Sequence, residues 1–160
     1  MLEEQVLDAA RHDRSAFQCG EPVLDAFVQK YALQQAAKGI STSFVLVDDA
    51  LPSRILGYYS LSAAQIDGYQ LAEAEQKRLP RYPVPCFRMG RLARDLSQRG
   101  TGIGRLLIGL AVGRCLQARS HVGAYALLVD AKNVHAKTFY AEYGFIACRD
   151  SPMTLYLPLG

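Results

Sequence analysis

Three glycines alternate along residues 98–107 (QRGTGIGRLL) and directly precede a run of large aliphatic residues. Their spacing does not fit a dinucleotide-binding loop, because Arg105 stands where the GxGxxG pattern needs its third glycine. No GxxxxGK followed by Ser or Thr occurs in the chain, which excludes a P-loop. A glycine loop that opens a helix nevertheless exposes backbone N–H groups that attract phosphate. From spacing alone, a phosphate site and a plain strand-to-helix turn remain equally good interpretations.

A second chemical candidate is Tyr140, within the stretch NVHAKTFYAEYGF (133–145). A phenol has a pKa of about 10, so it is protonated at neutral pH, and this pKa is close enough to the thiol pKa of about 8.5 for proton transfer to a departing thiolate. The alternative is packing beside Phe139 and Tyr143, because aromatic residues on an apolar helix face usually belong to the core. Asn133 suits the N-cap of the same helix.

The sequence shows no clear general base and no metal site. The residues considered as bases are His12, His121, His135, Glu142 and Asp95. We interpret the three histidines as surface residues or as residues satisfied by hydrogen bonds. The four cysteines form no CxxC pair and no zinc-type spacing, so we predict reduced thiols and no metal ligands. Thiol catalysis is not expected, because Cys86 and Cys115 have no base partner in view.

Length and composition indicate one soluble globular domain over residues 1–160, since half of the residues are hydrophobic and 21% are charged. The start of the chain, MLEEQVLDAARHDR, contains no apolar signal segment. No stretch approaches the roughly 18 apolar residues that a membrane-spanning helix needs. We therefore expect a cytoplasmic protein without a membrane segment. The net charge of +3 is small, but arginines crowd between residues 78 and 105.

The pattern of apolar residues predicts alternating strands and helices, which would position both chemical candidates. Helices are predicted over 21–38, 71–79, from 103 onward and over 133–143. Strands are predicted over 42–49 and 53–66 as an antiparallel pair, and over 87–96, 124–130, 144–150 and 153–159. The glycine loop would then connect a strand to a helix, and Tyr140 would lie on the last helix.

Two motifs in this order resemble the GCN5-related N-acetyltransferase (GNAT) superfamily. RGTGIG resembles its R/Q-x-x-G-x-G/A pyrophosphate loop, with Arg99, Gly102 and Gly104 at the fixed positions. NVHAKTFYAEYGF resembles its N-x-x-A-x-x-F-Y-x-x-x-G-F segment. The stretches FQCGEPVLDAFVQKYALQQAAKGISTSFV, GRLARD and SPMTLYL are most similar to the acetyltransferase toxins of type II toxin–antitoxin modules. One departure is Arg94, because many relatives carry an apolar residue after GRLA.

The resemblance implies an α/β fold of the α+β GNAT type, with one mixed, mostly antiparallel sheet of six to seven strands flanked by helices. Two splayed parallel strands would form a cleft for acetyl-CoA, the co-substrate. It implies that Tyr140 is the catalytic general acid toward the coenzyme sulfur. The cofactor-binding residues that it implies are Leu92, Ala93 and Arg94 through their main chain, the loop residues Arg99, Gly100, Thr101, Gly102, Ile103, Gly104 and Arg105, and Asn133 and Phe139.

For the toxin subgroup, the resemblance implies acetylation of the α-amine of an aminoacyl-tRNA, which would block translation. Free α-amines titrate near 7.7–8.0 and esterification lowers this pKa, so no general base is required. A tRNA is a polyanion, and we expect Arg78, Arg91 and Arg94 to contact it. The expected partners are a ribbon-helix-helix antitoxin of the DUF1778 type and a second copy in a homodimer, with DNA contacted only through the antitoxin.

Two alternatives share the cofactor residues. One is a GNAT enzyme that acetylates a small-molecule amine or a protein N-terminus. The other is a non-catalytic module that binds coenzyme A or keeps the fold for interactions.

Overall fold

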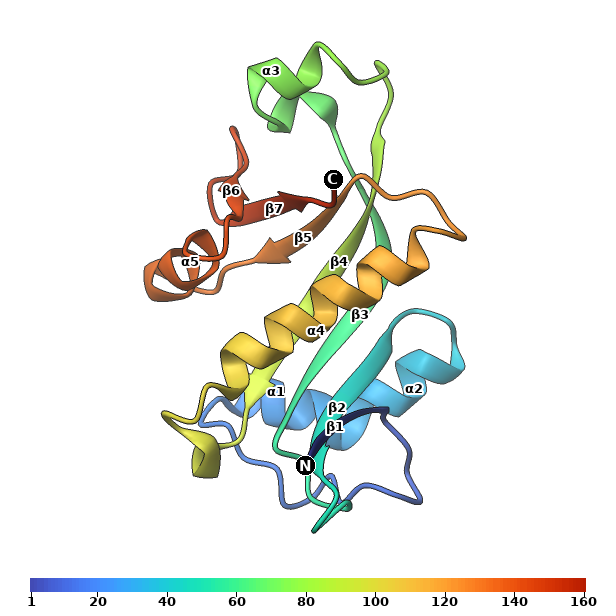
Figure 1. The fold of residues 1–160 in the computed structure, drawn as a ribbon, viewed down its shortest axis with the longest axis vertical. Coiled ribbons are helices and arrows are strands. Elements are labelled where there is room, and N and C mark those ends of the chain that lie inside the picture. The colour runs from blue at the N-terminus through green and yellow to red at the C-terminus, as the bar shows by residue number, and fades with distance from the viewer. The chain divides into compact units, whose positions relative to one another are not determined.

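The computed structural model describes all residues 1–160 and contains one seven-stranded sheet, with the strand order β1-β2-β3-β4-β5-β7-β6 (Figure 1). The strands β4 (Val84–Arg94) and β5 (Ala126–Asp130) pair in parallel. The pairs β1–β2, β2–β3, β5–β7 and β6–β7 are antiparallel. The structure therefore confirms the predicted mixed, mostly antiparallel sheet with one parallel pair.

The chain forms two compact units. Unit 1 contains Met1–Ser62 and Gly90–Ala111, and unit 2 contains Ala63–Met89 and Val112–Gly160. The chain passes from one unit to the other inside β3 (Gly57–Ile66), β4 and α4 (Ile103–Ala118).

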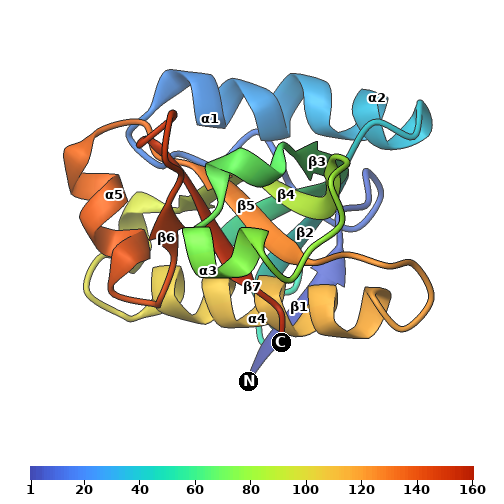
Figure 2. The same cartoon turned by 90° about the horizontal axis from the view of Figure 1, so that it is seen from above.

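Unit 1 packs helices on both faces of its strands. It contains β1 (Leu2–Val6), α1 (Pro22–Ala26), a π-helical turn η1 (Phe27–Tyr31), α2 (Ala32–Ala37), β2 (Thr42–Asp48) and a 3₁₀ turn η3 (Leu96–Gln98). Figure 2 shows α1 and α2 on one side of these strands and α4 on the other. The core beneath α1 and α2 includes Phe17, Phe27, Val28, Val47 and Tyr58. Burial of such apolar side chains contributes about 1.5–3 kcal/mol each.

The predicted helix over 21–38 is a helical segment over 22–37 that is interrupted by one wide π turn. The N–H of Ala32 donates to the carbonyl of Phe27, five residues earlier, instead of four. Phe27, Val28 and Ala32 all belong to the same buried cluster. Tertiary packing thus keeps these three side chains on the core side across the wide turn.

The sequence analysis missed β1, which is an edge strand. Leu2 to Val6 pair with Asp48 to Phe44 of β2 in antiparallel register. Its sequence, LEEQV, has little intrinsic preference for a strand, because glutamate is depleted in sheets. The exposed hydrogen-bonding edge of β2 supplies the partner that the local sequence does not specify.

Unit 2 contains the remaining elements, which are a 3₁₀ turn η2 (Gly68–Gln70), α3 (Glu73–Gln76), β5, α5 (Val134–Ala141), β6 (Ile146–Ala147) and β7 (Thr154–Pro158). Its core includes Leu71, Val84, Ala126, Leu128 and Tyr156. No helix of the chain is both long enough and apolar enough to cross a membrane.

Two elements of unit 2 are shorter than predicted. The helix expected over 71–79 covers only Glu73–Gln76, because Leu71 is buried in an extended conformation and Pro80 disfavours a helical Leu79. The strand expected over 144–150 contains only Ile146 and Ala147. Gly144 before it has a φ of +91°, which belongs to a turn and not to a strand.

Candidate active site

The glycine loop of unit 1 requires glycine at two positions for conformational reasons. Gly100 has a φ of +73° and Gly102 a φ of +82°, which is the left-handed region that other L-residues adopt at a cost of about 1–2 kcal/mol. Between them, the Thr101 hydroxyl donates to the carbonyl of Gln98 at 2.6 Å. The loop therefore has a defined shape before any ligand binds.

The loop ends at the N-terminus of α4, where backbone amides are available to an anion. The N–H of Leu106 donates the first hydrogen bond of this helix, to the carbonyl of Gly102 at 3.0 Å. The amides of residues 103–105 precede that bond, so they point out of the helix end, where the helix dipole adds positive charge. Thr101 and Gly102 are exposed, whereas Ile103 is buried and anchors the first turn. This end of α4 is suited to bind a phosphate group.

Asp95, between β4 and the loop, is an anchor for the loop. Its buried carboxylate accepts hydrogen bonds from the Gln18 amide at 3.0 Å and from the amide and hydroxyl of Ser97 at 3.1 and 2.6 Å. Burial opposes ionisation, but these donors and Arg54, 3.7 Å away, outweigh it and hold the pKa of Asp95 below its usual value. Asp95 is therefore an ionised structural group. The local signal for this role is the Asp-x-Ser turn pattern.

Gly57 in β3 allows α4 to approach the strands closely. A Cβ atom at this position would lie 2.8 Å from Leu107 Cδ1, 3.1 Å from Ile103 Cγ2 and 3.1 Å from the carbonyl oxygen of Ala93. The sequence analysis missed this residue, because no motif marks it.

β4 continues beyond its pairing with β5. The parallel register covers Cys86–Met89 opposite Ala126–Val129, and β4 runs on to Arg94. Leu92 and Arg94 are half-buried, and Ala93 is buried. Backbone groups of a strand that has lost one neighbour are available to a ligand with amide groups.

Tyr140 lies on α5 in unit 2, with 9% of its surface exposed. Its ring centroid lies 5.6 Å from those of both Phe139 and Phe145. The other strongly buried tyrosines, Tyr58, Tyr59 and Tyr156, each bond their hydroxyl to a carbonyl or carboxylate, whereas the hydroxyl of Tyr140 has no such partner in the protein. The ring of Tyr140 is thus fixed by packing while its hydroxyl keeps its hydrogen-bonding capacity.

The environment of Tyr140 makes it a weaker acid than an ordinary phenol. Burial raises the pKa of Tyr140 to about 12, and the negative charge of Asp130 contributes in the same direction. This value exceeds the pKa of about 10 assumed from the sequence. Tyr140 is therefore fully protonated at neutral pH, as a proton donor must be.

Two neighbours of Tyr140 on the sequence motif have structural roles. Asn133 is the N-cap of α5, and its side-chain oxygen accepts a hydrogen bond from the Ala136 amide at 2.8 Å. Phe139 is half-buried, and its ring contacts that of Tyr143 at a centroid distance of 5.2 Å. Both residues therefore position Tyr140 on its helix.

Asp130, at the end of β5, connects three strands of unit 2. Its carboxylate pairs with Arg88 of β4 and accepts a hydrogen bond from the hydroxyl of Thr154 in β7 at 2.9 Å. Only its position directly after a buried strand could have indicated this role from the sequence. Because β5 leads into α5, these bonds help to fix the helix that carries Tyr140.

The three arginines expected to contact RNA lie in different surroundings. Arg78 is exposed in unit 2, whereas Arg91 and Arg94 are half-buried in unit 1. The guanidinium of Arg91 lies over the ring of Phe27, 4.2 Å from its centroid. Arg91 and Arg94 are three residues apart on β4, so their side chains leave opposite faces of the strand.

The other titratable candidates include histidines that are either hydrogen-bonded or exposed, and two buried cysteines. His12 is buried and bonded to the Asp8 amide and to Gln5, and burial lowers its pKa, whereas His121 and His135 are exposed. Burial raises the pKa of the Cys86 thiol to about 11 and that of Cys115 to about 12. Both thiols are therefore protonated at neutral pH and poor nucleophiles.

Comparison with known proteins agrees with this arrangement. A family model described as "Acetyltransferase (GNAT) domain" matches residues 13–154. The chain belongs to the GNAT acetyltransferase family. This acetyltransferase is 34% identical over 145 residues to a tRNA-acetylating toxin of Mycobacterium tuberculosis, with 91% of the chain and 85% of the relative covered.

Solved structures of two toxin complexes share the fold of the acetyltransferase. AtaT complexed with acetyl-methionyl-tRNAfMet has a TM-score of 0.92 at 30% identity, covering 99% of this chain and 95% of AtaT. An AtaT mutant with a tyrosine-to-phenylalanine change, bound to acetyl-CoA and the C-terminus of the antitoxin AtaR, has a TM-score of 0.83 at 29% identity, covering 99% and 93%.

Replacing Gly102 by valine should weaken the binding of coenzyme A by about tenfold or more. A β-branched residue does not tolerate a φ of +82°, so the loop must change shape and the amides at the start of α4 lose their alignment. Gly109→Ala is the matched control, because a Cβ at Gly109 meets no atom within 4 Å. Isothermal titration with coenzyme A measures both variants. If Gly102→Val and the wild type bind coenzyme A with equal affinity, the phosphates of coenzyme A do not bind at the N-terminus of α4.

Proposed function

We propose that this acetyltransferase is a single domain over residues 1–160 that transfers an acetyl group from acetyl-CoA to the α-amine of an aminoacyl-tRNA. Such a modification blocks the amine that forms the next peptide bond, so the protein acts as a toxin of translation. The likeness to a tRNA-acetylating toxin over 91% of the chain supports this proposal. The observation that carries the chemistry is the buried, protonated Tyr140 with its unbonded hydroxyl.

The residues present fit acetyl-CoA as co-substrate. The amides of residues 103–105 at the start of α4 would bind the pyrophosphate, and Arg99 and Arg105 would add charge-assisted hydrogen bonds. The main chain of Leu92, Ala93 and Arg94 binds the pantetheine arm, and Asn133 and Phe139 complete the binding residues. When bound, acetyl-CoA supplies an acetyl group that is activated as a thioester.

The chain's own contribution to the reaction is one hydroxyl that donates a hydrogen bond and a set of backbone amides. The Tyr140 hydroxyl would donate a hydrogen bond to the sulfur of a bound thioester. Because its pKa of about 12 exceeds that of a thiol, about 8.5, full transfer to a free thiolate would be uphill. The hydroxyl would therefore stabilise negative charge on the sulfur through a hydrogen bond. A backbone amide of β4 stabilises the negative charge that develops on the carbonyl oxygen.

The partners follow from the same proposal. A ribbon-helix-helix antitoxin of the DUF1778 type holds the toxin inactive and connects it to DNA, and the toxin forms a homodimer in the cytoplasm. Arg78, Arg91 and Arg94 contribute contacts to the tRNA phosphates, and such contacts make binding sensitive to salt.

Mass spectrometry of aminoacyl-tRNAs after incubation with acetyl-CoA and the protein tests this function. We expect acetyl groups on the amino acid of one or a few charged tRNAs, and none after the tRNA is digested with nuclease before the reaction. Acetylation of free amines or protein N-termini, with charged tRNA left unmodified, would contradict the proposal.

The rate of acetylation should rise with pH up to about pH 8 and then stay constant to pH 10. The rise reflects loss of a proton from the substrate α-amine, whose pKa is about 8 or lower. No falling limb is expected in this range, because Tyr140 with a pKa of about 12 keeps its proton. Initial rates at subsaturating charged tRNA give the profile. A falling limb below pH 10 that is absent from Tyr140→Phe would show that the phenol titrates there.

A further inference from the structure

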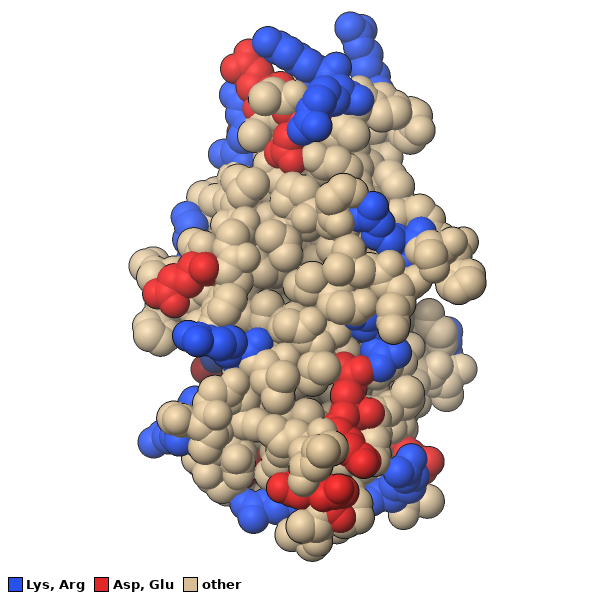
Figure 3. Space-filling view, viewed as in Figure 1, with Lys and Arg blue, Asp and Glu red and all other residues tan.

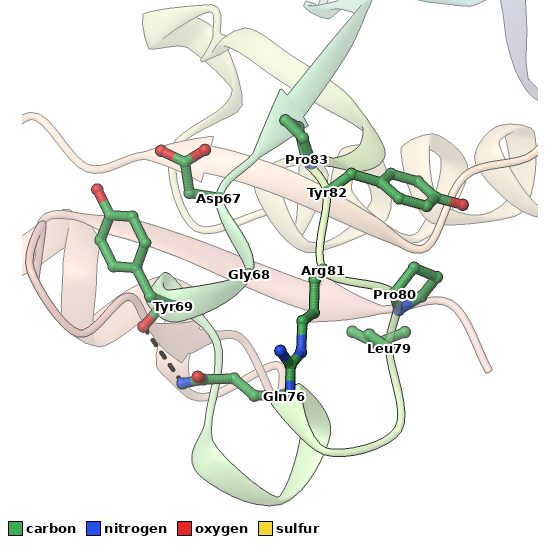
Figure 4. Close-up of a pocket in the computed structure, with 9 residues that line it drawn as sticks. All are labelled: Asp67, Gly68, Tyr69, Gln76, Leu79, Pro80, Arg81, Tyr82 and Pro83. Atoms are coloured by element: carbon green, nitrogen blue, oxygen red, sulfur yellow. Dashed lines mark hydrogen bonds between the residues drawn. The ribbon is translucent and has the colours of Figure 1, made fainter.

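A pocket of unit 2, remote in sequence from the motifs above, has no role in the proposed chemistry. It has a volume of about 280 Å³ and lies between η2, α3 and the segment that leads into β4 (Figure 4). This volume is slightly below the roughly 300–1,000 Å³ usual for drug-sized ligands, so it suits one small ring system. Its lining residues are Asp67, Gly68, Tyr69, Gln76, Leu79, Pro80, Arg81, Tyr82 and Pro83.

Two tyrosines of this pocket are exposed. Tyr69 is 53% exposed and Tyr82 is 63% exposed, although each carries a large apolar ring. Figure 4 shows them on two neighbouring segments at opposite sides of the pocket, with Arg81 between them and the two rings extending away from each other. Exposed aromatic rings beside a guanidinium are the usual means of stacking unpaired bases.

Basic side chains outnumber acidic ones on the surface around the pocket, because Lys77, Arg78 and Arg81 stand against two exposed carboxylates, Asp67 in the lining and Glu73 on α3. Lys77, Arg78 and Arg81 are all exposed and lie within five residues, and Figure 3 shows Lys and Arg side chains gathered over α3 and the segment after it, with acidic side chains beside them. A third carboxylate, Glu75, is directed inward, where the hydroxyls of Tyr125 and Tyr156 donate to it. Glu75 is only 8% exposed, so its charge does not face a ligand at this surface.

The pocket is held in shape by hydrogen bonds. The Gln76 side chain donates to the carbonyl of Leu71 at 2.8 Å and to that of Tyr69 at 3.3 Å, which joins α3 to η2. Leu71 is fully buried, and Glu75 fixes the same short helix to the core. A pocket formed in advance reduces the entropy cost of binding.

We propose that this pocket binds unpaired RNA, with one nucleobase stacked on Tyr69, a neighbouring base on Tyr82, and the flanking phosphates on Lys77, Arg78 and Arg81. The inference rests on the proposed function, and its natural ligand is the unpaired acceptor end of the tRNA. The pocket thus adds a stacking contact to the phosphate contacts and favours single-stranded over paired RNA.

The test compares the variant Tyr69→Ala/Tyr82→Ala with Tyr69→Phe/Tyr82→Phe, which keeps both rings. Fluorescence anisotropy measures binding of a labelled single-stranded RNA that ends in CCA, and of a blunt duplex of equal length, at one salt concentration. We expect the alanine variant to bind the single strand about 5- to 140-fold more weakly per lost stacked base, since stacking contributes about 1–3 kcal/mol. The phenylalanine variant and Tyr31→Ala, an exposed tyrosine of unit 1, should bind like the wild type.

Binding of the single strand by the alanine variant with wild-type affinity would overturn the proposal. So would a wild type that binds no single strand but binds an antitoxin peptide through the two tyrosines.

The same variants are assayed for acetylation of charged tRNA. For the alanine variant, the KM for charged tRNA should rise and kcat should not change. If the wild type binds the single strand through the tyrosines but acetylates no charged tRNA, the proposed function is wrong, whereas RNA binding by the pocket is confirmed. If the alanine variant acetylates charged tRNA with the KM of the wild type and binds the single strand with the same affinity, the proposed role of the pocket is wrong.

Discussion

Tyr140→Phe is expected to lower the turnover of acetyl transfer by about 10²–10⁴-fold, the usual contribution of a positioned acid. The substitution removes only the hydroxyl, which has no hydrogen-bond partner in the protein, and keeps the ring contacts with Phe139 and Phe145. Folding stability and the affinity for coenzyme A should therefore remain at wild-type values. Single-turnover rates, thermal unfolding and titration with coenzyme A measure the three quantities.

Tyr143→Phe is the matched control for this prediction. Tyr143 lies three residues after Tyr140 and packs against Phe139. The turnover of the Tyr143→Phe variant should therefore stay within about twofold of the wild type. A Tyr140→Phe variant with nearly wild-type turnover would show that Tyr140 is a packing residue, which was the alternative interpretation of its sequence context. Loss of kcat and kcat/KM by the same factor would show that the hydroxyl acts only in the transition state.

Gly57→Val is expected to destabilise the protein by about 3 kcal/mol or more, at the upper end of what overpacking of a core costs. The added Cβ would lie 2.8 Å from Leu107 Cδ1 and 3.1 Å from the carbonyl oxygen of Ala93, and a backbone atom cannot move away cheaply. For a chain of 160 residues, this corresponds to a fall in melting temperature of about 6–12 °C. Differential scanning calorimetry measures the melting temperatures of the variant and the wild type.

The same substitution should also weaken the binding of coenzyme A, because it displaces the first turns of α4 from β3 within unit 1. The control is Gly113→Ala, where a Cβ meets no atom within 4 Å. That change should leave affinity unaltered and stabilise α4 by up to about 1 kcal/mol, since alanine is the better helix former. Equal stability of Gly57→Val and the wild type would show that this packing contact is not tight.

The sequence by itself determined the local chemistry of this protein. Gly100 and Gly102 could be recognised because a left-handed backbone demands glycine, and the order strand, loop, helix follows from short-range periodicity. Tyr140 could be recognised from its motif, and Asn133 could be recognised as a cap, because capping involves residues only three apart. Seven strands with one parallel pair were within the range that the family resemblance implied.

Only the tertiary structure decided which residues support that chemistry. Gly57 and Asp130 act on atoms that are distant in sequence, as Asp95 does through its bond to Gln18, and no spacing rule predicts these contacts. The strand β1 exists because β2 offers it a hydrogen-bonding edge. The pKa of Tyr140 is raised by burial, and burial is a property of the packed fold. Motifs encode contacts between near neighbours, whereas packing and desolvation depend on which distant segments meet.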